Sequence, residues 1–249
     1  EFAFTQEQEM IRDTAAAFLA QVSGSEAVRR AMATEQGYME ELWRRICSDM
    51  VWQAIHIPES CGGMGLGYVE LVAMLEQMGR YLLCAPFFSS VCLAGNALRV
   101  VGSVEQQTHW LGKLCAGELT ATLAFNGGCS RWDATAVTAT WRKEGAGYVL
   151  NGDYRYVIDG HTAELLIVAA RAVGSTGAQG VGLFLLPAGT IGVTRKWLPS
   201  MDQTRKQAAV HLDNVRLGEE ALLGESGQGW GPLSKVIDLA TIALAAEQV

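Results

Sequence analysis

The spacing of the hydrophobic residues changes near position 120, and this change divides the chain into two parts. Before it, apolar side chains recur every three or four positions, as they do in amphipathic helices. Thr5 and Gln8 form a capping-box pattern ahead of the first such helix. Further helices are predicted over 38–50, 68–83, 89–101 and 104–114.

After position 120 apolar and polar residues alternate, which is typical of strands with one buried face. The predicted strands cover 134–142, 147–150, 154–158, 165–171, 181–187 and 208–217. The connections are short and contain Gly, Asn, Asp and Pro, so an antiparallel sheet folded into a small barrel or sandwich is expected. The Asn151-Gly152 pair is expected to form a tight turn.

A third pattern begins at Pro232, where the sequence is helical again and apolar nearly all round. Such a helix belongs inside a bundle, so it should pack on the N-terminal helices or against another chain. It carries no C-terminal capping signal, and we expect the chain to stop within a helical domain. The predicted fold class is therefore α+β: an N-terminal helical domain over 1–120, a middle β-domain over 121–225 and the first helix of an incomplete helical domain over 226–249.

Charge and composition restrict the classes of partner. The formal net charge is −7 and charged residues make up 18% of the chain. A nucleic-acid partner is not expected, because such proteins need a clustered basic face. Membrane insertion is not expected either, since no apolar stretch is long enough to span a bilayer. The low charge favours contact with another subunit, homo- or hetero-oligomeric.

Cysteine and histidine spacing excludes two kinds of site. The six cysteines lack CxxC spacing, so neither a disulfide framework nor a zinc site is predicted, and a reducing cytoplasm is the expected location. The four histidines show no metal-ligand spacing; His161, which directly follows the segment NGDYRYVIDG, is the one to consider, and a surface loop histidine is the more common interpretation. The glycine-rich segment IPESCGGMGLG has no Gly-Lys-Ser/Thr ending and does not follow a strand, so it is not a phosphate loop.

Several segments, taken together and in order, resemble the acyl-CoA dehydrogenase family. They are FTQEQEMIRDTAAAFLA, IPESCGGMGLG, WLGKLCAGELTATLAF, NGDYRYVIDG, MDQTRKQAAVHLDNVRL and GESGQGWG. The resemblance implies an N-terminal helical domain, a central β-domain and a C-terminal four-helix domain, of which this chain would contain the first two and the opening helix of the third.

The resemblance also implies FAD as cofactor, an acyl-CoA thioester as substrate and an electron-transfer protein as partner. An aromatic residue often packs on the flavin where Tyr156 stands, and a flat ring suits that role. The implied cofactor contacts are Phe125, Asn126, Trp132, Tyr156, Val157 and Ile158. The implied substrate contacts are Trp132, Asp238 and Thr241.

The sequence departs from the family at several of these positions. Ile158 replaces a Thr, and the segment NGGCSRWD keeps only Asp133 of the family's Thr-Glu-Pro-Gly-Ala-Gly-Ser-Asp pattern. Trp132 replaces a small Ser that meets phosphate, and Thr241 replaces an Arg. Ala240 stands where some members carry a catalytic Glu, so no catalytic residue is predicted in this chain and the base is expected beyond Val249.

Three functions stay open. The first is an FAD-dependent acyl-CoA dehydrogenase that performs α,β-dehydrogenation of an acyl-CoA thioester. The second is a non-catalytic partner subunit of a heteromeric acyl-CoA dehydrogenase, with degraded FAD contacts. The third is a flavin oxidase or monooxygenase on the same fold.

Overall fold

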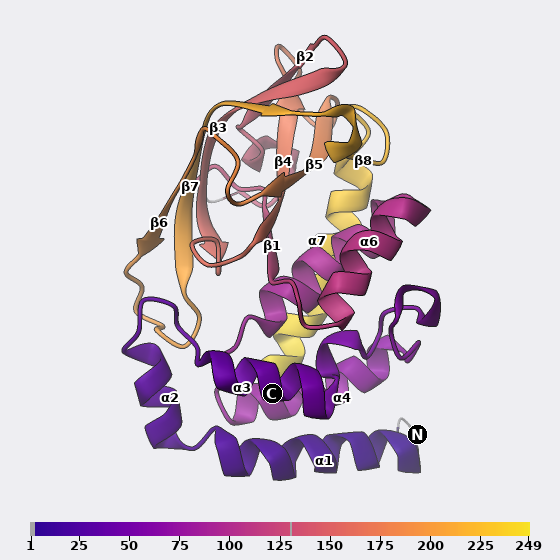
Figure 1. Cartoon of the computed structure of the whole chain (residues 1–249), viewed down its shortest axis with the longest axis vertical. Helices are drawn as coiled ribbons and strands as arrows, with labels where there is room; N and C mark the ends of the chain where they lie inside the picture. Colours follow the sequence, from indigo (N-terminus) through magenta and orange to yellow (C-terminus); the bar gives the residue numbers. More distant parts are fainter. Residues whose placement is uncertain (1–2, 130) are drawn as a thin grey trace.

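The helical spacing in the first half of the chain produces a helical layer at one end of the molecule (Figure 1). The computed structural model describes residues 3–129 and 131–249; Ser130, in the segment NGGCSRWD, lies outside the described residues, as do Glu1 and Phe2. The helices are α1 (Gln6–Val22), α2 (Ser25–Met32), α3 (Glu40–Arg45), α4 (Tyr68–Arg80), α5 (Asn96–Val101) and α6 (Val104–Cys115). Wider turns η1 (Ile46–Met50) and η4 (Phe88–Gly95) and tight turns η2 (Trp52–Ala54) and η3 (Glu59–Cys61) connect them.

Most of these helices agree with the predicted segments, and their starts show why. Thr5 accepts a hydrogen bond from the Gln8 backbone N–H, and the Gln8 side chain accepts one from the Thr5 N–H, so the predicted capping box is present. Helix α2 was not predicted, because it is short and buries only Val28 and Ala31 along its length. Two buried residues are too few to give a helical period.

The period-two region forms one sheet at the other end of the molecule (Figure 1). Its strands are β1 (Ala121–Ala124), β2 (Thr140–Glu144), β3 (Gly147–Ile158), β4 (Leu165–Ala172), β5 (Val181–Pro187), β6 (Val193–Leu198), β7 (Gln207–Leu217) and β8 (Leu222–Leu223). Tight turns η5 (Ala134–Ala136) and η6 (Glu219–Ala221) lie between strands. The order is β6-β7-β3-β2-β4-β5-β8, and β1 pairs with β4.

The expected antiparallel sheet is correct for most pairs, but the sheet is mixed. Strand β4 runs parallel to both β1 and β2. The reason is the order of the strands: β3 already pairs with β2 on one edge and with β7 on the other, so β4 joins the free edge of β2.

Three local predictions were wrong. Asn151-Gly152 is not a turn but a shift of register inside the continuous strand β3, and the Asn151 side chain accepts a hydrogen bond from the Asn214 N–H of β7 (2.7 Å). Residues 134–139 do not begin a strand, because Asp133 caps the short turn η5. Strand β6 was missed, since the polar run Thr194–Lys196 hides its alternation.

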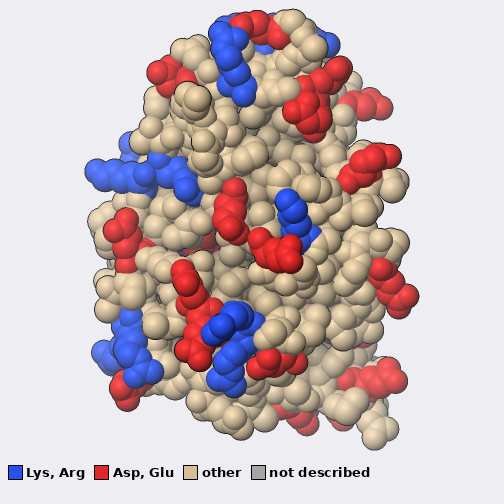
Figure 2. Space-filling view, in the orientation of Figure 1, with Lys and Arg blue, Asp and Glu red and all other residues tan. Residues whose placement is uncertain are grey.

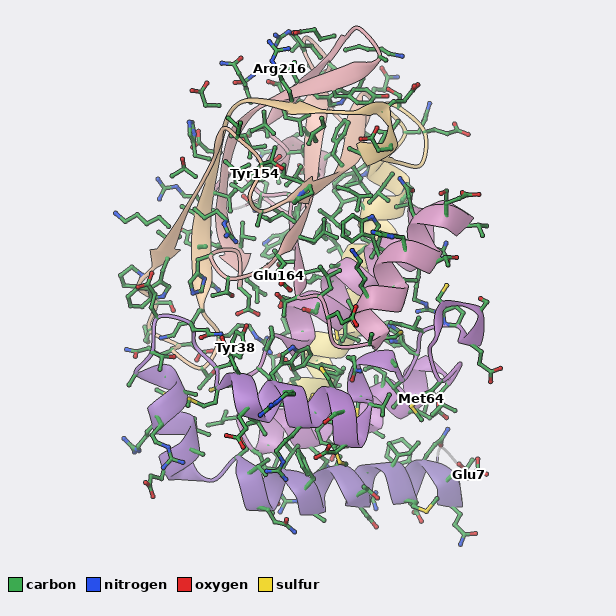
Figure 3. The ribbon with its side chains drawn as sticks, in the orientation of Figure 1. Glu7, Tyr38, Met64, Tyr154, Glu164 and Arg216 are labelled. Carbon is green, nitrogen blue, oxygen red and sulfur yellow. The ribbon has the colours of Figure 1, made fainter. Side chains whose placement is uncertain are left out.

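The sheet surrounds its own apolar core, in which Tyr154 is central (Figure 3). The buried Tyr154 hydroxyl donates to the Ala169 carbonyl at 2.9 Å, which satisfies its polar end. On the visible surface acidic and basic side chains are interspersed, with broad uncharged areas between them (Figure 2).

The last helix, α7 (Trp230–Glu247), packs against α4, α5 and η4. Packing on the N-terminal helices was one of the two arrangements expected from the sequence. Helix α7 buries Leu233, Val236, Ala240, Ala243 and Ala246 and exposes Ile242 and Leu244. The helix ends at Glu247, and the Gln248 N–H donates to the Ala245 carbonyl in a last tight turn. None of the described helices is both long and apolar enough to cross a membrane.

Helices α4 and α7 approach each other most closely at Gly79. A Cβ atom built there would lie 1.9 Å from the Glu247 carbonyl oxygen, so only glycine fits. In α6, by contrast, a Cβ on Gly112 would find its nearest neighbour 4.0 Å away.

We therefore expect opposite effects from the same substitution in two helices. Gly79→Ala should lower the free energy of unfolding by about 2–4 kcal/mol, because backbone must move. Gly112→Ala should raise it by about 0.5–1 kcal/mol, since alanine loses less entropy in a helix. Urea unfolding of both variants is the measurement, and equal effects would contradict the α4–α7 contact.

Candidate functional site

The end of strand β3 turns an aromatic side chain out of the sheet. The pairing register with β7 shifts between Tyr154 and Val157, which is the mark of a β-bulge. At this bulge Tyr156 has a backbone φ of 59°, in the left-handed region that aromatic residues rarely adopt. Its side chain is 60% exposed, whereas Tyr154 and Val157 on either side are buried. Backbone conformations of this kind cost free energy and cluster at functional sites.

Hydrogen bonds from neighbouring segments fix this bulge. The Arg155 N–H donates to the Asn126 carbonyl at 3.0 Å, and the Thr122 hydroxyl donates to the Ile158 carbonyl at 2.6 Å. Asn126, which follows β1, therefore lies directly beside the bulge.

A second aromatic side chain is exposed on that neighbouring segment. Trp132 is 71% exposed, and its ring centroid lies 6.0 Å from that of Phe125. The Asn126 side chain bonds within its own loop: its Oδ1 accepts from the Gly128 N–H at 2.7 Å, and its Nδ2 donates to the Arg131 carbonyl at 3.2 Å. Phe125, Asn126, Trp132 and Tyr156 are thus gathered at one rim of the sheet.

The α7 residues singled out from the sequence lie on the solvent side of that helix. Asp238 and Thr241 are both exposed and three positions apart, so they share one face. Ala240 is buried against the core. Phe125, Ile158 and Ile237 of α7 all pack at the margin of the same core cluster. In residues 3–129 and 131–249 no hydrogen bond, ion pair or ring contact joins Asp238 or Thr241 to Trp132 or Tyr156.

Sequence reasoning missed the buried carboxylate that supports the bulge. Asp159 follows Ile158, also has a left-handed backbone (φ 52°) and is buried. Its N–H donates to the Lys206 carbonyl at 2.9 Å, and its Oδ2 accepts from the Ser89 hydroxyl of η4 at 2.6 Å. Only the left-handed preference of Asp was a local signal, and it does not reveal partners 70 residues away.

The charge of Arg205 acts on this carboxylate, and the Arg205 side chain pairs with the end of α7. Its Nη2 lies 2.5 Å from Glu247 Oε2, and its guanidinium stacks 4.5 Å from the Phe88 ring centroid. Burial raises the pKa of Asp159 to about 6, although the Ser89 hydrogen bond and the charge of Arg205 oppose the rise. Burial likewise raises the pKa of Glu247, against the opposing effect of Arg205.

Comparison with known proteins places this geometry in a family. The acyl-CoA dehydrogenase N-terminal domain profile matches residues 5–118. An isovaleryl-CoA dehydrogenase of Oryza sativa subsp. japonica is 29% identical over 82% of this chain and 51% of its own length. Acyl-CoA dehydrogenase IpdE2 of Mycolicibacterium smegmatis is 29% identical over 98% of this chain and 66% of its own.

A solved structure agrees over the whole chain. The ChsE4-ChsE5 complex from Mycobacterium tuberculosis contains a chain with a TM-score of 0.87 and 26% identity, which covers 100% of this chain and 64% of its own. Residues 5–118 match the family's N-terminal domain, and the whole chain has the acyl-CoA dehydrogenase fold. It spans about half the length of the first curated relatives that it matches.

The structure shows where the side chains lie at two positions, Trp132 and Ile158, at which the sequence was expected to depart from the family pattern. Trp132 is exposed, so its indole meets no steric obstacle at this position. Ile158 is half-buried, and its carbonyl is held by Thr122, so its backbone position does not require a Thr hydroxyl. Within the described residues no group of three His, Cys, Asp or Glu side chains could hold a metal ion.

The raised pKa of Asp159 predicts a pH-dependent stability. Its pKa is higher in the folded chain, about 6, than its ordinary value of 3.8, so the folded state binds more protons between these values. The stabilisation is complete below about pH 4 and is lost as the pH rises through about 6.

Asp159→Asn should therefore reduce the fall of the unfolding free energy between about pH 4 and 7, and it should raise the unfolding free energy above pH 7 by about 2 kcal/mol. Asparagine keeps the left-handed backbone and can accept from Ser89. Asp13→Asn on exposed α1 is the matched control and should change neither quantity. Urea unfolding between about pH 4 and 8 measures both; an unchanged slope in Asp159→Asn would show that this carboxyl does not titrate as described.

Proposed function

We propose that this chain provides the flavin-facing wall of an FAD-dependent acyl-CoA dehydrogenase, which performs α,β-dehydrogenation of an acyl-CoA thioester. The observation that carries the proposal is Tyr156: an aromatic residue held in a left-handed bulge with its ring exposed. Exposure of a large aromatic side chain at the cost of backbone strain favours a role in binding a flat ligand.

The residues at the rim fit a flavin. Tyr156 offers an exposed ring for stacking, and the exposed Trp132, whose ring lies 6.0 Å from that of the half-buried Phe125, offers a second aromatic side chain. Val157 and Ile158 would present backbone at the ring edge, and Asn126 would hold the neighbouring loop in place. FAD, when bound, supplies a hydride acceptor. We assign Trp132, Asp238 and Thr241 to the acyl-CoA side.

The proton chemistry needs a carboxylate base, and the carboxylate next to Trp132, that of Asp133, is engaged in capping η5. Removal of the weakly acidic α-proton requires a positioned base. The helix position at which some members place a Glu is here the buried Ala240, so we assign no catalytic residue to this chain. An electron-transfer protein would reoxidise the flavin, and an oligomer in the cytoplasm is the setting that we propose.

A second candidate is a partner subunit that keeps the fold while its FAD contacts have degraded. Trp132, Ile158 and Thr241 favour it, because each replaces a polar group that would contact a phosphate, the flavin or the substrate. The similar chain from Mycobacterium tuberculosis was solved within a complex of ChsE4 with ChsE5, which supports a heteromeric arrangement. An oxidase or monooxygenase is the weaker alternative.

Flavin binding tests the role of Tyr156. We expect FAD to bind the chain with a dissociation constant weaker than about 1 µM, because the described residues present one wall for the ring. Tyr156→Ala should weaken binding about threefold to tenfold, the loss of one stacked pair, while Tyr156→Phe should retain it. Titration followed by flavin fluorescence measures this, and equal affinities for the two variants would count against the proposal.

One further variant separates the two candidates. If Trp132 has degraded a cofactor site, Trp132→Ser should tighten FAD binding about tenfold or more; if Trp132 serves as a flavin wall, it should weaken it. A flavin absorption band that bleaches with acyl-CoA, in the presence of a subunit that supplies the base, supports the dehydrogenase. No flavin band on this chain in such a complex supports the partner subunit.

A further inference from the structure

An open pocket of about 520 Å³ lies where the β-domain meets the connection between α2 and α3. Figure 1 shows this connection beside the ends of β6 and β7. The lining residues are Glu35, Gln36, His161, Thr162, Arg195, Lys196 and Trp197. None of them belongs to the proposed flavin or substrate contacts.

The pocket is basic although the chain is acidic. Arg195 and Lys196 both line it, and Glu35 is the one carboxylate among its lining residues. Behind it lies Lys206, which is 2% exposed; its Nζ donates to the Met32 carbonyl at 2.7 Å and sits 5.0 Å from the Trp197 ring centroid. A buried ammonium group that contacts a carbonyl and a ring raises the local positive potential.

Two buried nitrogen atoms of the lining residues have no hydrogen-bond partner in the described structure. They are the Trp197 Nε1 and the His161 Nδ1. Buried polar atoms are rarely left unpaired, so each indicates a partner that the protein itself does not supply. The indole N–H can only donate, which requires an acceptor.

The His161 ring is oriented so that it can become a second donor. Its Nε2 lies 2.7 Å from the Glu35 carbonyl oxygen, which can only accept, so Nε2 carries the hydrogen. Nδ1 is then bare in the neutral ring and donates only after protonation. Burial lowers the pKa of His161, and the charges of Arg195 and Lys206 lower it further, whereas the Glu35 carbonyl and carboxylate raise it. An anion in the pocket would favour the protonated ring and so raise the pKa of His161.

Arg195, on strand β6, bonds to the loop that carries His161. Its Nη1 donates to the Ala163 carbonyl at 2.7 Å and to the Gly160 carbonyl at 3.3 Å, on either side of His161. Strand β6 and the loop that carries His161 are thus fixed at a constant separation, which preorganises the pocket.

We propose that this pocket binds a phosphate-type oxyanion, with the Trp197 N–H and protonated His161 Nδ1–H as donors and Arg195 and Lys196 as counter-charges. Oxyanions match this set because their several acceptor oxygens can meet convergent donors, and charge-assisted hydrogen bonds are the strong ones. The ligand is a free oxyanion or a small phosphate ester.

Binding is tested with inorganic phosphate on the 249-residue chain, against chloride at matched ionic strength, by the NMR signals of His161 and the tryptophan fluorescence. We expect saturable phosphate binding that Arg195→Met weakens about tenfold or more and that Trp197→Phe, which keeps a ring but removes the N–H, weakens about threefold to tenfold. Lys143→Met on exposed β2 makes the same charge change elsewhere and should bind like the parent. Tighter binding of 5′-AMP than of phosphate would assign an ester, and equal or weaker binding a free oxyanion.

A pH series with sulfate, whose charge is constant, tests the role of His161. Binding should be tighter near about pH 6 than near about pH 8, and His161→Gln should abolish this dependence. Phosphate effects no larger than those of chloride, equal affinities of Arg195→Met and Lys143→Met, or sulfate binding without a pH dependence would each overturn the proposal. Because these titrations contain no flavin or acyl-CoA, their failure does not bear on the proposed dehydrogenase.

Discussion

The structure around the rim depends on one buried interaction, the hydrogen bond that the Ser89 hydroxyl donates to the Asp159 carboxylate. Asp159 is the residue at which the sheet meets the helices, because it follows β3 and Ser89 belongs to η4. The charge of Arg205, which pairs with Glu247 at the end of α7, also acts on Asp159. A buried carboxylate without a hydrogen-bond donor is costly. A movement of the β3 bulge away from η4 would leave the Asp159 carboxylate without its Ser89 donor, so this hydrogen bond ties the bulge that carries Tyr156 to the helices.

Glycine and backbone geometry complete the same constraint. Gly79 lets the carboxyl end of α7 contact α4, which brings Glu247 within reach of Arg205. On the sheet side, two hydrogen bonds hold the bulge. The Thr122 hydroxyl donates to the Ile158 carbonyl, and the Asn126 carbonyl accepts from the Arg155 N–H. The exposed ring of Tyr156 is thus the consequence of contacts from β1, from Asn126 after it and from η4 together. A site fixed from several elements keeps its shape before a ligand arrives, which lowers the cost of binding.

Sequence reasoning was most successful where the determinants are local. The Thr5–Gln8 capping box and the period of α4 depend on residues three or four positions apart, and both were predicted. The Asn151-Gly152 pair shows the limit: its local preference is a turn, but pairing with β7 keeps it in a strand. The conformation of Tyr156 and the burial of Asp159 could not be predicted, because they depend on Asn126, Lys206 and Ser89, which are distant in the chain. The resemblance to a family singled out Tyr156 and Trp132, whose role stays a prediction; it could not predict the buried Asp159–Ser89 hydrogen bond next to them.

The central claim is that the strained, exposed Tyr156 is a flavin wall, and a crystal structure of the chain with FAD tests it most directly. The account predicts that the isoalloxazine stacks on the Tyr156 ring, with centroids about 4.5–7 Å apart and Trp132 at its border. The left-handed conformation of Tyr156 and the Asp159–Ser89 hydrogen bond should persist in that complex. A flavin bound elsewhere on the chain, or a Tyr156 that folds back into an ordinary strand conformation, would contradict the account.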